Sequence, residues 1–345
     1  MNETFLKACR GEAVDYTPVW IMRQAGRYLP QYQKVRAKVD FLTLCKTPEL
    51  AAEVTLQPIE ILGVDAAILF SDILIPVEAM GMDLEFSESK GPVLHNPVRD
   101  EAGVRTLRPV VPEQDVPFVM DTVRLLRQRL QVPLIGFSGA PFTLATYMIE
   151  GGSSRNFLHT KRMMFQAPDL FASLMEKITE NVVSYLDAQI RAGAQAVQVF
   201  DSWVGVLSPR DFEYVALPWV KKIVASFKGR VPVIYFAFNG GAMLNRVKEA
   251  GADVYGLDWR IDMADAVRQL GPDTVVQGNL DPCLLFGPRD EIRSRAAEVL
   301  KGGRTARAHI FNLGHGILPE TPVENAIALV ESVHELSGGK RLQHG

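Results

Sequence analysis

The sequence predicts an α/β fold, a single (β/α)8 TIM-type barrel, and two observations lead to this prediction. Eight short apolar runs alternate with longer amphipathic runs along the 345 residues. The runs are mostly continuous rather than alternating, which is typical of parallel strands covered on both faces. Eight such units in a chain of this length favour a closed barrel over an open doubly wound sheet. No G-x-G-x-x-G turn follows the first run, which also speaks against a dinucleotide-binding sheet.

The predicted strands are short and rich in Val, Ile, Leu and Phe. They are Pro18–Met22, Ala66–Phe70, Pro133–Phe137, Ala196–Phe200, Pro232–Ala237, Val254–Leu257, Thr274–Gln277 and His309–Leu313. Between them, apolar residues recur at helical spacing, and a capping residue before proline or a terminal glycine marks several ends. The predicted helices are Pro48–Leu62, Pro168–Ala192, Arg210–Phe227, Met243–Glu249, Met263–Leu270, Arg289–Leu300 and Pro322–Leu336.

One stretch does not fit a simple strand–helix unit. Gly81–Gln114 contains a short apolar run, a polar turn and then proline-rich chain, which predicts an inserted hairpin or flap after the second strand. No linker or change of composition divides the chain, so we expect one domain over residues 1–345. Its last residues, Ser337–Gly345, are polar and glycine-rich, and we expect them to be frayed.

Composition excludes several classes of protein. The chain is 47% hydrophobic and 22% charged with a formal net charge of −3, which argues against extended disorder and against bulk binding of nucleic acid. No run approaches the ~18 apolar residues of a membrane helix, and the first residues show no signal peptide. Three cysteines, Cys9, Cys45 and Cys283, lack metal or redox spacing, which indicates a cytoplasmic protein without a disulfide framework.

The chemistry of such a barrel lies at the carboxyl ends of its strands, so the residues after each run matter most. Arg23 and Arg27 follow the first run. In a helical turn their Cβ atoms would lie ~5–6 Å apart on one face, and two guanidiniums that close need an anion between them. Two alternatives remain open for this pair: a site for carboxylates of a ligand, or surface arginines paired with the protein's own acids.

Other polar residues follow the later runs. Asp72 ends an apolar run, where it could be a general base, a metal ligand, an acceptor for N–H groups of a ligand, or a loop cap. His315 lies between two glycines and suits a donor to an anionic group, or a loop-capping role. For Asp201 and Asp258 we expect structural roles, such as bonding loop amides. The signals at Tyr147 and Ser202 are weaker, since no G-x-S-x-G elbow surrounds Ser202.

Seven ordered blocks make the chain resemble the uroporphyrinogen decarboxylase family along nearly its whole length. The Arg23-Gln-Ala-Gly-Arg27-Tyr28 sequence is the most specific of them. The blocks are Pro18–Pro30, Phe70–Leu74, Gly136–Ala145 with Tyr147 and Glu150–Gly152, Phe200–Trp203, Gly256–Trp259, Gln277–Pro282 and Asn312–Ile317. Departures from the family pattern are local: Gln31 stands where glutamate is common, and Ser153–Arg155 varies a glycine loop.

The resemblance implies a (β/α)8 barrel, a cytosolic homodimer, no cofactor and no metal. It implies removal of CO2 from the four acetates of uroporphyrinogen III to give coproporphyrinogen III, with catalytic roles for Asp72, Arg23 and Arg27. The residues implied in substrate binding are Arg23, Gln24, Ala25, Gly26, Arg27, Asp72, Tyr147, Ser202 and His315. Two alternatives stay open: a zinc- or cobalamin-dependent methyltransferase of a related barrel, and a non-catalytic tetrapyrrole-binding protein.

Overall fold

The computed structural model describes residues 2–87 and 91–338, and within them one parallel sheet of seven strands forms the centre. The strand order β1-β4-β5-β6-β7-β8-β9 follows the chain, so each strand lies beside the next. These strands are β1 (Ala67–Ile68), β4 (Leu134–Gly139), β5 (Ala196–Asp201), β6 (Val233–Ala237), β7 (Val254–Gly256), β8 (Val275–Leu280) and β9 (Ala308–Leu313). All seven agree with predicted strands to within three residues at each end, and the remaining predicted strand is the first, Pro18–Met22.

The segment around Val19 closes the curled sheet into a barrel. Val19 forms a parallel bridge with Phe311 of β9. On its other side, the carbonyl of Val19 accepts a hydrogen bond from the backbone N–H of Asp65, just before β1, at 2.8 Å. Val19 therefore occupies the eighth position of the ring, between the last strand and the first. The predicted TIM-type barrel is confirmed.

The first predicted strand, Pro18–Met22, is shorter than expected. The backbone N–H of Met22 donates to the side-chain oxygen of Asn312, and that of Ile21 donates to the side-chain oxygen of Gln24. Because side chains rather than a neighbouring strand take up these N–H groups, pairing stops after Trp20, whose N–H still donates to Phe311. This early end frees the following residues to form a loop at the mouth of the barrel.

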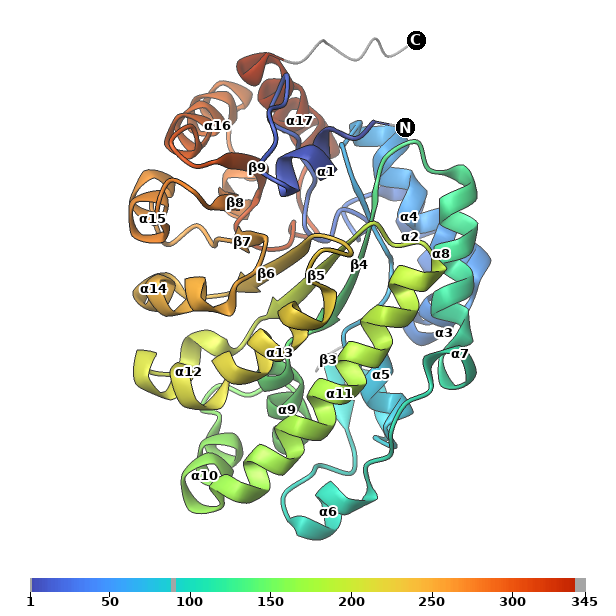
Figure 1. Cartoon of the computed structure of the whole chain (residues 1–345). Coiled ribbons are helices and arrows are strands. Elements are labelled where there is room, and N and C mark those ends of the chain that lie inside the picture. Colours follow the sequence, from blue (N-terminus) through green and yellow to red (C-terminus); the bar gives the residue numbers. More distant parts are fainter. Residues whose placement is uncertain (1, 88–90, 339–345) are drawn as a thin grey trace.

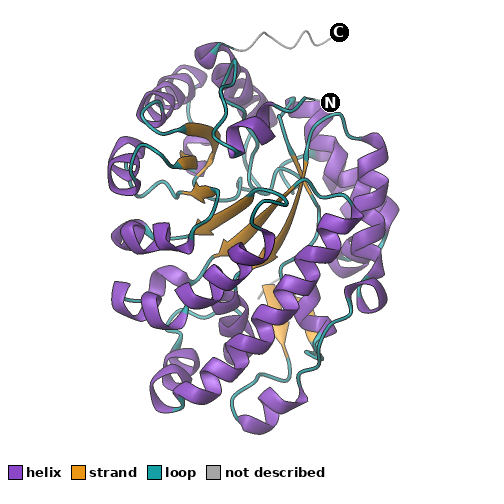
Figure 2. Ribbon diagram, viewed as in Figure 1, coloured by secondary structure: helices purple, strands orange, loops and turns teal. Residues whose placement is uncertain are grey.

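Helices surround the sheet on its outer side (Figures 1 and 2). The longer ones are α4 (Pro48–Leu62), α8 (Pro117–Arg129), α9 (Pro141–Glu150), α10 (Leu158–Gln166), α11 (Pro168–Ala192), α13 (Leu217–Phe227), α15 (Met263–Leu270), α16 (Arg289–Gly303) and α17 (Val323–Ser337). The shorter ones are α1 (Thr4–Cys9), α2 (Pro30–Arg36), α3 (Phe41–Lys46), α5 (Ile75–Ala79), α6 (Glu101–Thr106), α7 (Pro112–Asp115), α12 (Pro209–Val215) and α14 (Leu244–Val247). None of the helices in the described ranges is long and apolar enough to cross a bilayer.

Three predicted helices, Pro48–Leu62, Pro168–Ala192 and Met263–Leu270, have the bounds that the sequence predicts. The predicted Arg210–Phe227 is instead two helices, α12 and α13, which meet at Ala216. Pro218 has no N–H to donate to the preceding turn, so a continuous helix would lose a hydrogen bond there. The predicted Met243–Glu249 is similarly divided into α14 and the flanking 3-10 turns η2 (Gly241–Met243) and η3 (Lys248–Ala250). Further 3-10 turns are η1 (Val204–Val206) and η4 (Pro282–Phe286).

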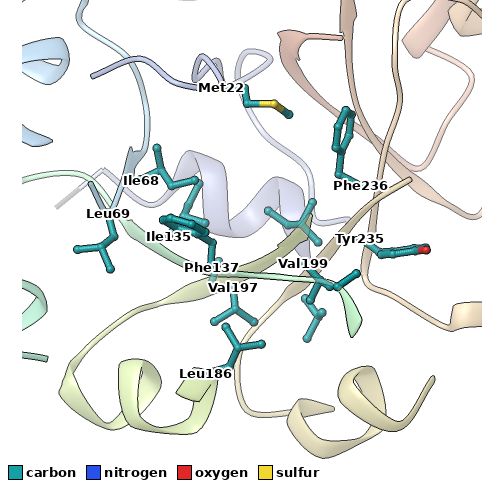
Figure 3. Packing of buried hydrophobic residues seen from close by; sticks show 14 of the residues in the cluster. Met22, Ile68, Leu69, Ile135, Phe137, Leu186, Val197, Val199, Tyr235 and Phe236 are labelled. Atoms are coloured by element: carbon teal, nitrogen blue, oxygen red, sulfur yellow. The ribbon is translucent and has the colours of Figure 1, made fainter. Parts of the chain in front are cut away.

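The buried apolar side chains form one continuous cluster that runs through the strands and the inner faces of the helices. Figure 3 shows part of it, with Ile68 and Ile135, which pair in register across β1 and β4, and Leu186 of α11 beneath the sheet near Val197. Burial on both faces explains why the strands are continuously apolar. The cluster gives the strand ends a rigid base, so the loops that follow them are held in fixed positions.

The excursion after β1 contains the expected hairpin. Strands β2 (Leu84–Ser87) and β3 (Gly91–Leu94) pair in antiparallel fashion, with Leu84 opposite Leu94. Helices α6 and α7 follow in the stretch that was expected to be irregular. Ser337, the first residue of the predicted frayed tail, is instead the last residue of α17. The tip of the hairpin, residues 88–90, and residues 339–345 lie outside the described residues, so the rest of the frayed tail stays a prediction.

Candidate active site

The predicted site residues gather at the carboxyl ends of the strands, the edge at which a barrel of this type carries its chemistry. Asp72 follows β1, and Ser202 directly follows β5. Tyr147 lies in α9, the helix after β4, and His315 lies in the loop after β9. Arg23 follows the Val19 segment that separates β9 from β1. Five separate segments therefore bring polar side chains to one end of the sheet.

The loop that carries the two arginines is not helical, so the spacing that a helical turn would give Arg23 and Arg27 does not apply. A tight turn forms instead, in which the N–H of Gln24 donates to the carbonyl of Ile21 at 2.9 Å. Arg23 adopts a positive φ of 62°, an uncommon conformation outside glycine. The fully buried Gln24 side chain holds the turn, because its amide donates to the carbonyl of Ala66 at 3.1 Å and its oxygen accepts from Ile21.

The side chain of Gln24 bonds main-chain groups and so holds the loop. The substrate-binding roles implied for Gln24, Ala25 and Gly26 stay a prediction. Ala25 and Gly26 are half-buried, and a side chain at Gly26 would meet the carbonyl of Arg23 at 2.9 Å. The side chains of Arg23 and Arg27 are exposed and available.

Arg23 lies at the centre of the group. Its guanidinium is close enough to lower the pKa of each of three groups: the Asp72 carboxyl, the Tyr147 hydroxyl and the His315 ring. The stem of Arg23 packs directly over Gly316, where any side chain would clash with its Cγ and Cδ atoms. The structure thus places four of the predicted site residues in one electrostatic cluster.

Asp72 is half-buried at the end of β1. Its Oδ1 accepts the backbone N–H of Leu74 at 2.8 Å, so the loop-cap role applies to one oxygen. Its Oδ2 has no hydrogen bond to any part of the chain that the structure describes, and is left to accept from a ligand. Burial raises the pKa of Asp72 above its ordinary value, while the Leu74 N–H and the Arg23 guanidinium act in the opposite direction.

His315 packs against Phe238, with ring centroids 4.7 Å apart. Burial, with the guanidiniums of Arg23 and Arg260, lowers the pKa of His315 to about 4. The ring is therefore neutral at pH 7, with one N–H donor and one acceptor. A neutral histidine can hydrogen-bond a carboxylate but adds no positive charge to the site.

Trp203 is a neighbour of both Tyr147 and Ser202. The Tyr147 ring packs on Trp203 at a centroid distance of 5.7 Å, and Ser202 precedes Trp203 in the turn after β5. Burial raises the pKa of Tyr147, so its hydroxyl stays protonated and can donate. Both residues are half-buried at the mouth.

A buried aspartate holds the turn that carries Ser202. Asp201 accepts hydrogen bonds from the hydroxyls of Thr143 at 2.7 Å and Tyr235 at 2.8 Å, and Thr143 accepts the backbone N–H of Trp203 at 3.1 Å. Burial raises the pKa of Asp201 to about 6. The structural role expected for Asp201 is confirmed, through hydroxyl groups rather than loop amides.

Asp258 also has the structural role that the sequence predicts. Its two oxygens accept the backbone N–H groups of Asn239 at 2.6 Å and of Arg260 at 2.8 Å. These bonds join the loops after β6 and β7, and they fix the backbone at this side of the mouth.

Arg27 acts on a different group from the three on which Arg23 acts. It and Arg36 both act on Tyr32, where their positive charges lower the pKa that burial raises. Tyr32 packs against Phe70, which comes two residues before Asp72 in the chain, at 5.7 Å. The carboxylate-binding role of the Arg23 and Arg27 pair stays a prediction.

Sequence reasoning missed a hollow formed by the segment that follows the arginine block. This cavity of about 640 Å³ is lined by Arg36–Leu42 and by Glu85–Phe86 of the hairpin, so two basic residues, Arg36 and Lys38, face two acidic ones, Asp40 and Glu85. Phe41 lines it and packs against Phe86 at 4.7 Å. Two basic residues just after the arginine block were the available signal, but scattered surface lysines and arginines look the same in a sequence.

No cluster suited to a metal was found among the described residues, where three or more His, Cys, Asp or Glu side chains would have to converge. Cys9 and Cys45 are buried and Cys283 is exposed, and none of the three forms a disulfide. The donors at the mouth are guanidiniums, hydroxyls and a neutral imidazole, with one open carboxylate. Such a set suits an anionic organic ligand that also carries a hydrogen-bond donor.

Comparison with known proteins agrees with this chemistry. The family model described as "Uroporphyrinogen decarboxylase (URO-D)" matches residues 1–336. A uroporphyrinogen decarboxylase of Desulfotalea psychrophila is 58% identical over 98% of this chain and 99% of its own length. One of Carboxydothermus hydrogenoformans is 57% identical over 98% and 97%. A solved methyltransferase from Methanosarcina mazei superposes with a TM-score of 0.81 over 97% of this chain and 98% of its own, but at 23% identity this likeness shows the fold alone. The chain belongs to the uroporphyrinogen decarboxylase family.

Proposed function

We propose that the protein decarboxylates uroporphyrinogen III, converting its four acetates into methyl groups to give coproporphyrinogen III. Relatives of that name match the chain at 57–58% identity over nearly its full length. The single observation in the site that carries the proposal is the open Oδ2 of Asp72, beside the Arg23 guanidinium at the mouth of the barrel. A carboxylate in that position can accept the N–H groups that converge at the centre of a porphyrinogen.

The reaction needs an acceptor for the electron pair that the departing CO2 leaves behind, and the substrate can supply it. Protonation of a pyrrole carbon makes the ring electron-poor. The bond between the acetate methylene and its carboxyl group then breaks, CO2 leaves, and the electron pair enters the ring as an exocyclic methylene forms. A proton adds to that methylene and the ring proton departs, so each round consumes one proton in total. The protein's tasks are placement and charge stabilisation.

Each site residue then has a distinct role. Asp72, when ionised, binds the pyrrole N–H groups and stabilises the positively charged ring. Arg23 and Arg27 bind carboxylates at the substrate rim, since guanidiniums pair with carboxylates in a planar fork. Tyr147, Ser202 and the neutral His315 donate to further carboxylates.

A turnover assay tests the proposal and separates it from its two rivals. Purified protein incubated anaerobically with uroporphyrinogen III should yield hepta-, hexa-, penta- and tetracarboxylate products by chromatography. A non-catalytic tetrapyrrole-binding protein would bind the substrate and release it unchanged. A zinc- or cobalamin-dependent methyltransferase would transfer a methyl group and lose activity with a chelator, whereas we expect EDTA to leave decarboxylation unchanged.

We propose further that the chain acts as a single domain in a cytoplasmic homodimer. One continuous apolar cluster through the barrel supports the single domain, and the family resemblance supports the dimer and the location. Light scattering should give about twice the 38.2 kDa of one chain. A single-chain mass at micromolar concentration would contradict the dimer.

A further inference from the structure

An arginine outside the proposed set lies at the same end of the barrel. Arg260 is in the loop after β7. The ring has eight positions when the Val19 segment is included, and β7 lies four positions from β1 in either direction. Arg260 therefore follows the strand opposite the one that Asp72 follows.

The guanidinium of Arg260 packs on two aromatic rings and forms a long ion pair, 3.6 Å, with Asp258. Its Cζ lies 4.1 Å from the ring centroid of Trp259 and 4.8 Å from that of Phe238. Cation–π contacts of this kind fix a guanidinium while leaving its N–H edge free. A side chain that is already ordered loses less entropy when it binds a ligand.

The N–H groups of Arg260 have little to bind within the protein. Its one acidic neighbour, Asp258, is 3.6 Å from Nη1, beyond hydrogen-bond distance, and both oxygens of that carboxylate already accept backbone N–H groups. Across the described residues, the Arg260 side chain forms no hydrogen bond. The side chain is about half exposed, so an anion can reach it.

A hollow adjoins this free edge. A cavity of about 320 Å³ is lined by Asn239, Gly241, Ala242, Asp258, Arg260 and Ile261. At Gly241 an added Cβ would meet only Ile261, at 3.7 Å, so the wall there is open. Asn239 adopts a positive φ of 60° and is exposed at the rim, where its side-chain amide can also donate. The hollow has room for a short carboxylate chain and has two donors.

His315 connects this hollow to the Arg23 cluster. The His315 ring packs on Phe238 at 4.7 Å, the same phenylalanine over which Arg260 lies. Arg23 and Arg260 each lower the pKa of His315, so the two guanidiniums flank it. Asp72, Arg23, His315 and Arg260 thus form a series of neighbours that spans the mouth.

We propose that Arg260 binds a propionate carboxylate of the substrate, at the rim of the macrocycle on the β7 side of the barrel. This assignment rests on the proposed decarboxylase function. A reacting acetate must lose its charge as neutral CO2, so a strong ion pair with it would stabilise the ground state against reaction. A propionate keeps its charge through all four rounds, and a fixed cation can hold one in each round.

Three variants test the assignment. Arg260→Gln removes the charge and Arg260→Lys keeps it without the planar fork. Arg268→Gln is the matched control, because Arg268 lies on α15 in the same strand–helix unit, is 75% exposed and forms an ion pair with Asp265 one turn away. Steady-state kinetics with uroporphyrinogen III would give kcat and KM. Anaerobic calorimetry would give the Kd of coproporphyrinogen III, whose only carboxylates are propionates.

In Arg260→Gln we expect KM and the product Kd each to rise about tenfold, with kcat within about twofold of the unchanged protein, as for lost uniform binding. Arg260→Lys should recover part of the affinity, and Arg268→Gln should match the unchanged protein. An unchanged Kd for coproporphyrinogen III in Arg260→Gln would overturn the propionate assignment, whether or not KM rises. If the unchanged protein binds coproporphyrinogen III but does not turn over uroporphyrinogen III, the decarboxylase proposal fails, while the calorimetric comparison still decides the role of Arg260.

Discussion

Replacing Asp72 by asparagine separates the two contributions of this side chain, to stability and to catalysis. The asparagine oxygen can still accept the Leu74 N–H that Oδ1 accepts at 2.8 Å, so the loop after β1 should keep its shape. What is lost is one negative charge opposite the cationic ring of the intermediate. Two unit charges about 4 Å apart in a partly buried site, with an effective dielectric constant near 20, interact by about 4 kcal/mol. That energy corresponds to a fall in kcat of about 10³-fold.

The stability of Asp72→Asn should not fall with its kcat. Burial raises the pKa of Asp72, so its ionised form is disfavoured in the folded protein relative to the unfolded chain. Asp72 therefore contributes most to folding when it is protonated at low pH, and this contribution is lost as pH rises through its raised pKa. At pH 7 Asp72→Asn should be at least as stable as the unchanged protein in urea unfolding.

The matched control for Asp72 is Asp262→Asn. Asp262 also accepts the N–H two residues ahead, that of Ala264 at 2.8 Å, but it caps α15 and is exposed. Single-turnover decarboxylation of uroporphyrinogen III measures the chemical step in both variants. We expect near-normal turnover in Asp262→Asn. A folded Asp72→Asn protein with more than a tenth of normal kcat would refute the electrostatic argument.

Three further predictions follow from neighbouring contacts. Gly316→Ala should raise KM several-fold at unchanged melting temperature, because the new Cβ displaces the Arg23 stem, whereas Gly103→Ala, where the nearest atoms are 3.4 Å away, should not. His315→Gln should lessen the loss of stability on acidification from pH 6.5 to 4, because the depressed pKa of His315, about 4, lets the unfolded chain bind the proton first; urea unfolding across this range checks it. Asp201→Asn should flatten the fall in stability as the pH rises from 4 to 6. Burial raises the pKa of Asp201 from 3.8 to about 6, which corresponds to about 3 kcal/mol. An unchanged curve of stability against pH would contradict the burial of this carboxyl group.

The sequence predicts the barrel well because strand burial and helix capping are local patterns. Continuous apolar runs identify β4 to β9, and a proline start with a glycine end gives α4 its observed bounds, Pro48–Leu62. Helices α8, α9 and α10 were not predicted. Pro141 and Gly151 mark the ends of α9 in the usual way, but its apolar sequence continues that of β4 without a polar break.

The site is only partly predictable, for a physical reason. Asp72 and His315 can be found because each follows an apolar run directly. The positive φ of Arg23 depends on Gln24, whose side chain bonds main-chain groups on both sides of the turn, and no short motif encodes that contact. Arg260 could not be identified from the sequence either, because the contact that holds it is with Phe238, which is distant in sequence and packs beside it in space.

The central claim is that the carboxylate of Asp72 binds the centre of a porphyrinogen while guanidiniums bind its rim. A crystal structure of the protein with coproporphyrinogen III measures this directly. We predict pyrrole nitrogens within hydrogen-bond distance of Asp72 Oδ2, and a propionate on Arg23. A macrocycle whose nitrogens lie away from Asp72, or one bound outside the mouth of the barrel, would contradict the account.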